Sequence, residues 1–137
     1  PTEEAFLPEF LRDAGYVTAC FGKWHLGFFR QQYLPSSRGC DVTAGLYNAQ
    51  GDHFLHTIDG GYDWHVGEQP ALWASGNYSG ELVRDAAVSF VHAHAVEAGT
   101  QQQLQPFFMY VAFQEAHSPY QAPAEYLALY SAPPCRT

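Results

Sequence analysis

The chain has 137 residues, 47% of them hydrophobic and 15% charged, which excludes a disordered protein and allows one domain with a buried core. Six Lys and Arg against fourteen Asp and Glu give a formal net charge of −8, which excludes a nucleic acid or an acidic membrane surface as partner. No apolar run approaches the roughly 18 residues that a membrane span requires, so none is predicted.

The two ends of the sequence carry no targeting or terminal signal. The chain starts at Pro1 without a basic or apolar leader, and it stops at Thr137, where no helix or strand is being completed. We therefore expect further sequence beyond both ends.

The first predicted elements are a helix and a strand. Residues 7–14 have helical spacing, with Pro8 in the first turn and Gly15 placed to end the helix. The apolar run over residues 16–21 then predicts a buried strand. A helix, a glycine and a strand in this order are typical of an α/β unit.

The end of this strand carries the sharpest chemical signal. Residues 22–27 read Gly-Lys-Trp-His-Leu-Gly, so that Lys23 and His25 lie between glycines, and Trp24 is expected to pack. A lysine and an imidazole two positions apart form a compact cationic corner suited to an oxyanion. The net charge of −8 does not cancel it, because distant charges are screened beyond about 8 Å, whereas a contact at about 4 Å is worth on the order of 4 kcal/mol.

Residues 28–80 form a long polar excursion with weak periodicity, apart from a strand-like run at 53–58. Such a segment in a compact domain is usually a binding loop or a lid, so we expect it to border the site. Imidazole and carboxylate also bind transition metals, but the spacing matches no ligand pattern and composition alone explains these residues better. The residues concerned are Asp52, His53, His56, Asp59, Asp63 and His65.

The clearest predicted helix covers residues 81–96. Ser79 is a plausible N-cap, Gly99 ends the helix, and one face carries Val83, Ala86, Ala87, Phe90, Val91 and His94. Asn77 begins an Asn-Tyr-Ser sequon just before it, a glycosylation site if the chain enters the secretory route.

A second strand and a histidine loop follow. The apolar run over residues 106–113 predicts a strand covered on both faces, and the polar loop at 114–119 contains His117; residues 124–130 predict a last short helix. Ligands bind beyond the carboxyl ends of strands in open α/β sheets, so Lys23, His25 and His117 converge if the two strands are parallel near neighbours. The structural alternatives are a solvated strand-end lysine, a capping histidine and a loop histidine bonded to backbone.

The three cysteines form neither a Cys-x-x-Cys pair nor a zinc pattern. Cys20 lies inside the first strand and is expected to be a buried thiol, while Cys40 and Cys135 are candidates to pair with each other or with residues beyond the chain. Arg38 either holds a carboxylate or simply pairs with Asp41, and we favour the pair with Asp41.

Three segments resemble the sulfatase family. Residues 14–27, Ala-Gly-Tyr-Val-Thr-Ala-Cys-Phe-Gly-Lys-Trp-His-Leu-Gly, are similar to its second signature, and residues 34–41 resemble the segment that follows. Residues 110–119, Tyr-Val-Ala-Phe-Gln-Glu-Ala-His-Ser-Pro, resemble the later histidine loop of the arylsulfatase B-like branch, which includes arylsulfatases I and J. The resemblance runs from about residue 6 to residue 131. It implies an α/β protein with the alkaline-phosphatase-like α/β/α sandwich fold. The reaction that it implies is hydrolysis of a sulfate ester.

The resemblance also implies roles for single residues. Family members use a formylglycine, made from a cysteine in a Cys-x-Pro-x-Arg context, and a calcium ion that polarises the sulfate oxygens. By this resemblance Lys23 holds a sulfate oxygen, His25 hydrogen-bonds the formylglycine hydrate, and His117 donates a proton to the departing alcohol.

The chain departs from the family pattern in two respects. None of its cysteines begins a Cys-x-Pro-x-Arg sequence, and it contains no Asp-Asp or Asp-Asn pair to bind calcium. We therefore expect residues 1–137 to be a partial sulfatase catalytic domain that lacks the nucleophile-bearing N-terminal part and the C-terminal part, has no metal ligands of its own, and is inactive alone.

Two other functions remain open at this point. One is a truncated, inactive sulfatase-like protein that acts as a binding or interaction module; the other, weaker one is a phosphatase of the same superfamily, because phosphate and sulfate share tetrahedral geometry. The family implies a small-molecule or saccharide sulfate ester as partner, and the lysosome, the endoplasmic reticulum or the cell exterior as compartment.

Overall fold

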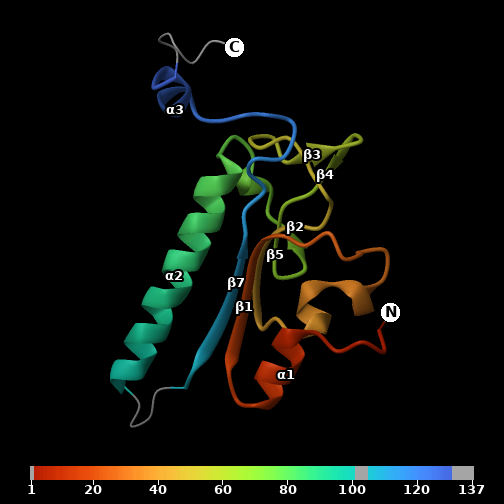
Figure 1. Ribbon diagram of the computed structural model, residues 1–137, viewed down its shortest axis with the longest axis vertical. Helices are drawn as coiled ribbons and strands as arrows, with labels where there is room; N and C mark the ends of the chain where they lie inside the picture. The colour runs from red at the N-terminus through yellow and green to blue at the C-terminus, as the bar shows by residue number, and fades with distance from the viewer. Residues whose placement is uncertain (1, 101–104, 131–137) are drawn as a thin grey trace.

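The computed structural model describes residues 2–100 and 105–130, which form a five-stranded sheet in the order β6-β5-β2-β1-β7 (Figure 1). Its parallel part consists of β1 (Val17–Lys23), β2 (Val42–Leu46) and β7 (Phe107–Ala112). The short strands β5 (His65–Val66) and β6 (Gln69–Pro70) continue it in antiparallel fashion. The first and last apolar runs are therefore parallel neighbours, which is the condition set above for Lys23, His25 and His117 to converge.

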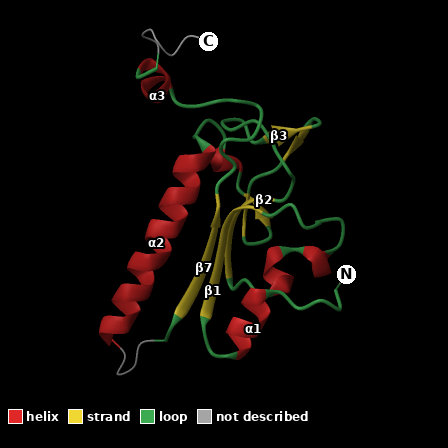
Figure 2. Ribbon diagram, in the orientation of Figure 1, coloured by secondary structure: helices red, strands yellow, loops and turns green. Residues whose placement is uncertain are grey.

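Helices lie against both faces of the sheet (Figure 2). Along β1, Ala19 and Phe21 belong to the core on the side of α2 (Ser79–Thr100), where the Phe21 and Phe90 rings lie 6.0 Å apart. The intervening Cys20 lies on the opposite face of the sheet, where it lines the same hollow as the first residues of α1 (Leu7–Asp13). The alternation of a strand thus gives β1 two covered faces, as a layered α/β sandwich requires.

The first helix forms and ends as predicted. The Glu9 carboxylate reaches back to the backbone N–H of Phe6, and after the last turn the N–H of Gly15 donates to the Arg12 carbonyl at 2.9 Å. Gly15 adopts a left-handed φ of +88°, which a helix-terminating glycine tolerates without strain.

The longest helix, α2, extends the predicted range 81–96 at both ends. Val83, Ala86, Ala87 and Phe90 pack on the core as predicted, whereas Val91 is 39% exposed and does not. The partly buried His94 binds the Gln105 carbonyl through Nε2 at 2.7 Å. Within the described part of the chain, no helix has the length and apolar character to cross a membrane.

The long excursion is more ordered than the sequence indicates. Besides β2, β5 and β6 it contains three short 3-10 helices, η1 (Gln31–Tyr33), η2 (Pro35–Arg38) and η3 (Leu72–Ala74), and the hairpin β3 (Thr57–Ile58) with β4 (Gly61–Tyr62). These short elements were not expected from the weak periodicity, although more than half of the excursion lies outside any helix or strand. The last short helix, α3 (Ala124–Ala128), lies within the predicted range.

Two of the strand predictions also need correction. The run 53–58 is extended only at its end, because the Asp52 carboxylate accepts the N–H groups of Phe54 and Leu55 at 2.9 and 2.6 Å and so turns the chain. The strand β7 is at the edge of the described sheet and Tyr110 is 51% exposed, so it is not covered on both faces.

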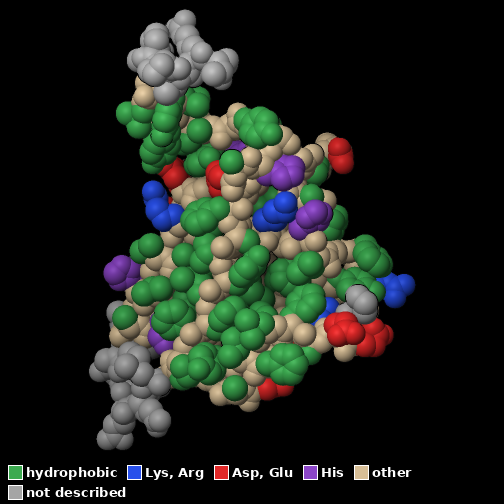
Figure 3. Space-filling view, viewed as in Figure 1, with side chains coloured by type: hydrophobic (Ala, Val, Ile, Leu, Met, Phe, Trp, Pro, Cys, Tyr) green, Lys and Arg blue, Asp and Glu red, His purple; other side chains and the backbone are tan. Residues whose placement is uncertain are grey.

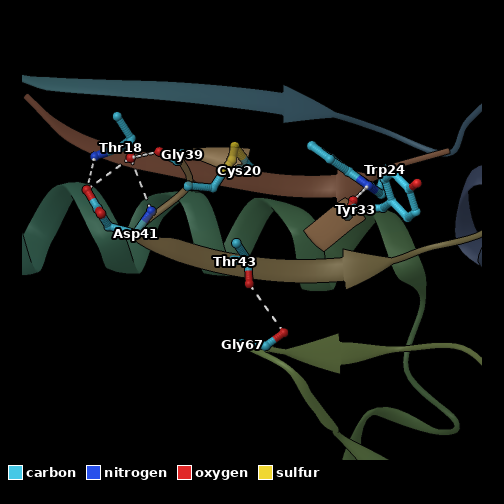
Figure 4. Close-up of a disulfide and its surroundings, with 9 residues drawn as sticks. Thr18, Cys20, Trp24, Tyr33, Gly39, Asp41, Thr43 and Gly67 are labelled. Carbon is cyan, nitrogen blue, oxygen red and sulfur yellow. Dashed lines mark hydrogen bonds between the residues drawn. A yellow bond between two sulfur atoms is a disulfide. The ribbon is translucent and has the colours of Figure 1, made fainter. Parts of the chain in front are cut away.

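Cys20 and Cys40 form a disulfide that joins β1 to the start of β2 (Figure 4). The expectations of a free Cys20 thiol and of a bond between Cys40 and Cys135 are therefore wrong; Cys135 lies outside the described residues. The backbone brings the two together, because the N–H of Asp41 donates to the Thr18 carbonyl at 2.9 Å and sets residue 40 beside residue 20.

Removing this disulfide should cost about 3 kcal/mol of folding free energy, because it closes a loop of 20 residues in the unfolded chain. The measurement is urea denaturation of the Cys20→Ala/Cys40→Ala double variant, with reduction of the unchanged protein as a second route to the same open loop. Equal midpoints for oxidised and reduced protein would contradict the prediction.

Arg38 does not pair with Asp41. Its guanidinium lies 3.3 Å from the Glu9 carboxylate and 3.8 Å from the centre of the Phe6 ring, so it ties η2 to α1. Asp41 instead accepts the N–H of Thr18 at 2.9 Å. Arg38 and Glu9 are 29 residues apart in the sequence, so their pairing depends on the tertiary fold and no local pattern indicates it.

Candidate functional site

The three predicted site residues lie at or beyond the carboxyl ends of two adjacent parallel strands. Gly22 of β1 pairs with Ala112 of β7, and Lys23 pairs with Leu46 of β2. Lys23 therefore ends the central strand of the parallel part, between two neighbours that end at the same edge. The loop that carries His117 leaves this edge directly after β7.

Two glycines allow the strand ends to approach one another closely. A Cβ atom on Gly22 would collide with the carbonyl oxygen of Ala112, and one on Gly45 would collide with the carbonyl oxygen of Gly22. Gly22 also has a left-handed φ of +99°. The close approach of β1 to β7 therefore requires a glycine immediately before Lys23.

The two residues after Lys23 remain hydrogen-bonded to the end of β2. The N–H groups of Trp24 and His25 donate to the carbonyls of Leu46 and Tyr47 at 2.9 and 3.1 Å. The Trp24 indole donates to the Tyr33 carbonyl at 2.8 Å (Figure 4), so its role is structural, as predicted.

Lys23 and His25 border one open hollow of about 890 Å³. Lys23 is partly buried and His25 is exposed, and the side chain of neither has a hydrogen bond or ion pair within the described ranges. The rest of the lining is mostly apolar and includes Phe6, Tyr110 and Phe113. Basic and histidine side chains gather above a broad hydrophobic area on the face seen in Figure 3.

His117 lies in the loop between β7 and α3. Its Nδ1 is 2.9 Å from the Ser118 carbonyl oxygen, and because a carbonyl only accepts, Nδ1 carries the proton of that bond. The other nitrogen, Nε2, belongs to an exposed side chain and has no partner among the residues placed in the structure. No hydrogen bond or ion pair joins His117 to Lys23 or His25 in this part of the chain.

Behind His117 is a buried polar cluster that the sequence did not reveal. His53 is 1% exposed and its Nε2 lies 3.3 Å from the His117 carbonyl oxygen. Its Nδ1 lies 3.1 Å from the Ser79 hydroxyl and 3.3 Å from the Glu115 carboxylate, and Ser79 donates to Glu115 at 3.0 Å. Three distant segments meet here, which no local pattern could indicate.

Further hydrogen bonds join the excursion to the histidine loop. The N–H of His53 donates to the Gln121 side chain at 2.7 Å, and the Gln121 amide donates to the Asp52 carboxylate at 2.8 Å. The buried Gln114 amide donates to the Gly51 carbonyl. The excursion therefore does border the histidine loop.

All of the metal candidates in the excursion except the exposed Asp59 have structural partners within the described residues. No group of three His, Cys, Asp or Glu side chains that could hold a metal ion occurs in residues 2–100 and 105–130. His56 binds the Ala74 carbonyl through Nε2 at 3.1 Å, and burial holds the pKa of His56 below its usual value.

Asp63 is a second structural anchor. Its carboxylate accepts the backbone N–H groups of Tyr47 and Asn48 at 2.9 and 2.8 Å. Burial alone would raise the pKa of this carboxyl, but the His65 imidazole 3.4 Å away and the hydrogen bonds from those two amides hold its pKa below the usual value. The ionised Asp63 thereby fixes the segment that follows β2.

The sequon residue Asn77 is exposed, and its side-chain amide donates to the Ala74 carbonyl at 3.1 Å. Ser79, the third residue of the sequon, is fully buried in the cluster with His53. Glycosylation of Asn77 stays a prediction.

The whole chain, residues 1–137, matches the family model for sulfatases. The chain belongs to the sulfatase family. Among its sulfatase relatives, arylsulfatase J of Mus musculus is 35% identical over 136 residues, which cover 95% of this chain and 22% of that protein. N-acetylgalactosamine-6-sulfatase of Homo sapiens is 30% identical over 138 residues, covering 93% and 25%. The chain thus spans about a quarter of the length of these curated sulfatases.

Solved structures show the same fold. Ps i-CgsB in complex with k-i-k-neocarrahexaose superposes with a TM-score of 0.80 at 24% identity, covering 96% of this chain and 31% of that one. The sulfatase PsFucS1 from Pseudoalteromonas sp. gives a TM-score of 0.68 at 23% identity, covering 90% and 29%. The predicted alkaline-phosphatase-like α/β fold is confirmed, present here as part of a sulfatase domain.

Proposed function

We propose that this chain supplies the sulfate-binding and proton-donating side of the active site of a sulfuric ester hydrolase. The observation that carries the proposal is the Lys23 ammonium, partly buried and without a partner in the described part of the chain, beside His25 at the carboxyl ends of parallel strands. A cation in this position is suited to an anionic group that approaches from the hollow.

Lys23 binds a sulfate oxygen and acts most strongly in the transition state. As the bond from sulfur to the bridging oxygen lengthens, negative charge grows, and a fixed cation near it gains interaction energy. His25 lies on the same hollow and hydrogen-bonds the attacking group. The two side chains thus share one ester headgroup.

His117 protonates the departing alcohol through Nε2. Because Nδ1 is engaged with the Ser118 carbonyl, the proton that the imidazolium delivers comes from Nε2. The bridging oxygen takes this proton as its bond to sulfur breaks, and neutral imidazole is left with its Nδ1 bond intact. Poor leaving groups gain most from this step.

Residues 1–137 do not fit the two cofactors of the family. None of the three cysteines lies in a Cys-x-Pro-x-Arg sequence, and two of them are joined in a disulfide. The described residues contain no acidic cluster for calcium. The precursor cysteine of formylglycine is therefore not in this sequence, and the described residues offer no ligands for calcium.

The substrate we propose is a sulfate ester on a saccharide. Support comes from the relatives: one is named N-acetylgalactosamine-6-sulfatase, and one solved neighbour is in complex with a carrahexaose. The disulfide between Cys20 and Cys40 supports an oxidising compartment, which includes the endoplasmic reticulum, the lysosome and the cell exterior.

The test is hydrolysis of an aryl sulfate and of the matched aryl phosphate by the full-length protein. We expect turnover of the sulfate and a far lower rate with the phosphate. A higher rate with the aryl phosphate than with the aryl sulfate would contradict this proposal and favour a phosphatase of the same superfamily. Binding of a sulfated saccharide without any hydrolysis would instead indicate an inactive binding module.

A further inference from the structure

We propose that His53 is a positioning residue for His117, holding the backbone of the histidine loop so that the proton-donating Nε2 of His117 faces the substrate. The inference rests on the proposed function, in which His117 protonates the leaving alcohol. His53 itself touches no substrate: it is 1% exposed and acts through the loop.

The contact to His117 is direct and has a defined polarity. Nε2 of His53 lies 3.3 Å from the His117 carbonyl oxygen, and since that oxygen only accepts, Nε2 carries the hydrogen. The same peptide group leads to Ser118, whose carbonyl binds Nδ1 of His117. The buried imidazole thus restrains the backbone that sets the orientation of the exposed one.

The second nitrogen of His53 holds the same loop at another point. Nδ1 lies 3.3 Å from the carboxylate of Glu115, two residues before His117, and 3.1 Å from the hydroxyl of Ser79. Ser79 is the first residue of α2 and is fully buried. The loop is therefore fixed at residues 115 and 117 to the end of the longest helix.

His53 is itself held firmly, through its backbone and through its ring. The backbone N–H of His53 donates to the Gln121 side chain at 2.7 Å, and the backbone carbonyl of His53 accepts the N–H of Ser79 at 2.8 Å. The Tyr78 ring stacks on the imidazole of His53, with centroids 5.8 Å apart and planes 16° apart. A residue held at both its backbone and its ring can restrain its neighbour in turn.

Two amide substitutions separate the two nitrogens of His53. The amide nitrogen of glutamine takes the place of Nε2, so His53→Gln keeps a donor for the His117 carbonyl. The amide of asparagine takes the place of Nδ1, so His53→Asn keeps the contact to Ser79 and Glu115 but loses the one to His117. The pair therefore tests the contact that carries the proposal.

The measurement is kcat of the full-length variants on a series of aryl sulfates whose phenols differ in pKa. His53→Asn should lower kcat about tenfold or more for the poorest leaving group and less than about threefold for the best, because a good leaving group needs no proton. His53→Gln should stay within about threefold of the unchanged protein across the series. Adding His53→Asn to His117→Ala should cause no further loss.

Three results would overturn the inference: equal losses for the asparagine and glutamine variants, a loss independent of the leaving group, or an additive loss in the double variant. Failure of both variants to fold, seen by thermal denaturation, would also overturn it by making His53 a residue of the fold alone. If His117→Ala itself shows no dependence on the leaving group, the proposed role of His117 fails, whatever His53 does.

Discussion

Replacing Lys23 with alanine in the full-length protein should lower kcat for a sulfate ester by about 100-fold or more, the loss seen when one oxyanion-stabilising group is removed. The ammonium has no partner within the described residues, so its removal breaks no contact there that holds the fold. The thermal midpoint should therefore change little while turnover collapses.

Arg12→Ala is the matched control for Lys23→Ala. Arg12 is an exposed cation in the last turn of α1, and its removal lowers the net charge by the same one unit. Because screening confines charge effects to about 8 Å, turnover should be unchanged. Equal losses in the two variants, or no loss in either, would show that Lys23 has no special place in the site.

Gly22→Ala should destabilise the protein by about 3 kcal/mol or more, the largest effect on stability that we expect from a single methyl group. A residue with a side chain pays about 1–2 kcal/mol for a left-handed φ, and Gly22 has a φ of +99°. In addition, the new Cβ collides with the carbonyl oxygen of Ala112, so β1 and β7 must separate.

Gly15→Ala isolates the collision from the backbone strain. Gly15 has a similar φ of +88°, but a Cβ there meets nothing within 4 Å. It should therefore cost only the conformational part, about 1–2 kcal/mol, in the same urea denaturation experiment. If both variants lose the same stability, close approach of the strands is not what requires a glycine before Lys23.

The sequence predicted those parts of the fold that depend on local signals. The helix before Gly15 follows from periodicity and its end signals, and the apolar strands β1 and β7 and the core of α2 follow from hydrophobic pattern, although α2 begins at Ser79 itself and continues past Gly99. The parallel pairing of β1 and β7 was stated only as a condition, because two apolar runs that lead into polar loops do not by themselves fix which strands are neighbours. Lys23 and His25 were nevertheless placed at a sheet edge without coordinates.

Apart from the run 53–58, which a local turn at Asp52 interrupts, the errors share one physical cause, which is dependence on contacts between distant residues. The strand β2 contains Thr43 and Gly45 and is recognisable only once it lies against β1. The bond between Cys20 and Cys40 follows from that same pairing. The sequence offered His53 only as a metal candidate, because its partners come from two other segments.

The side chains of Gln114 and Gln121 hydrogen-bond residues of the excursion 28–80, which we expect to contact the alcohol part of the substrate. They thereby join the excursion to the loop that carries His117, the proposed proton donor. An insertion near Gly51 or Asp52 would therefore disturb catalysis as well as selectivity. A change of the preferred sugar should then require mutations both in the excursion and in the histidine loop, rather than mutations in the excursion alone.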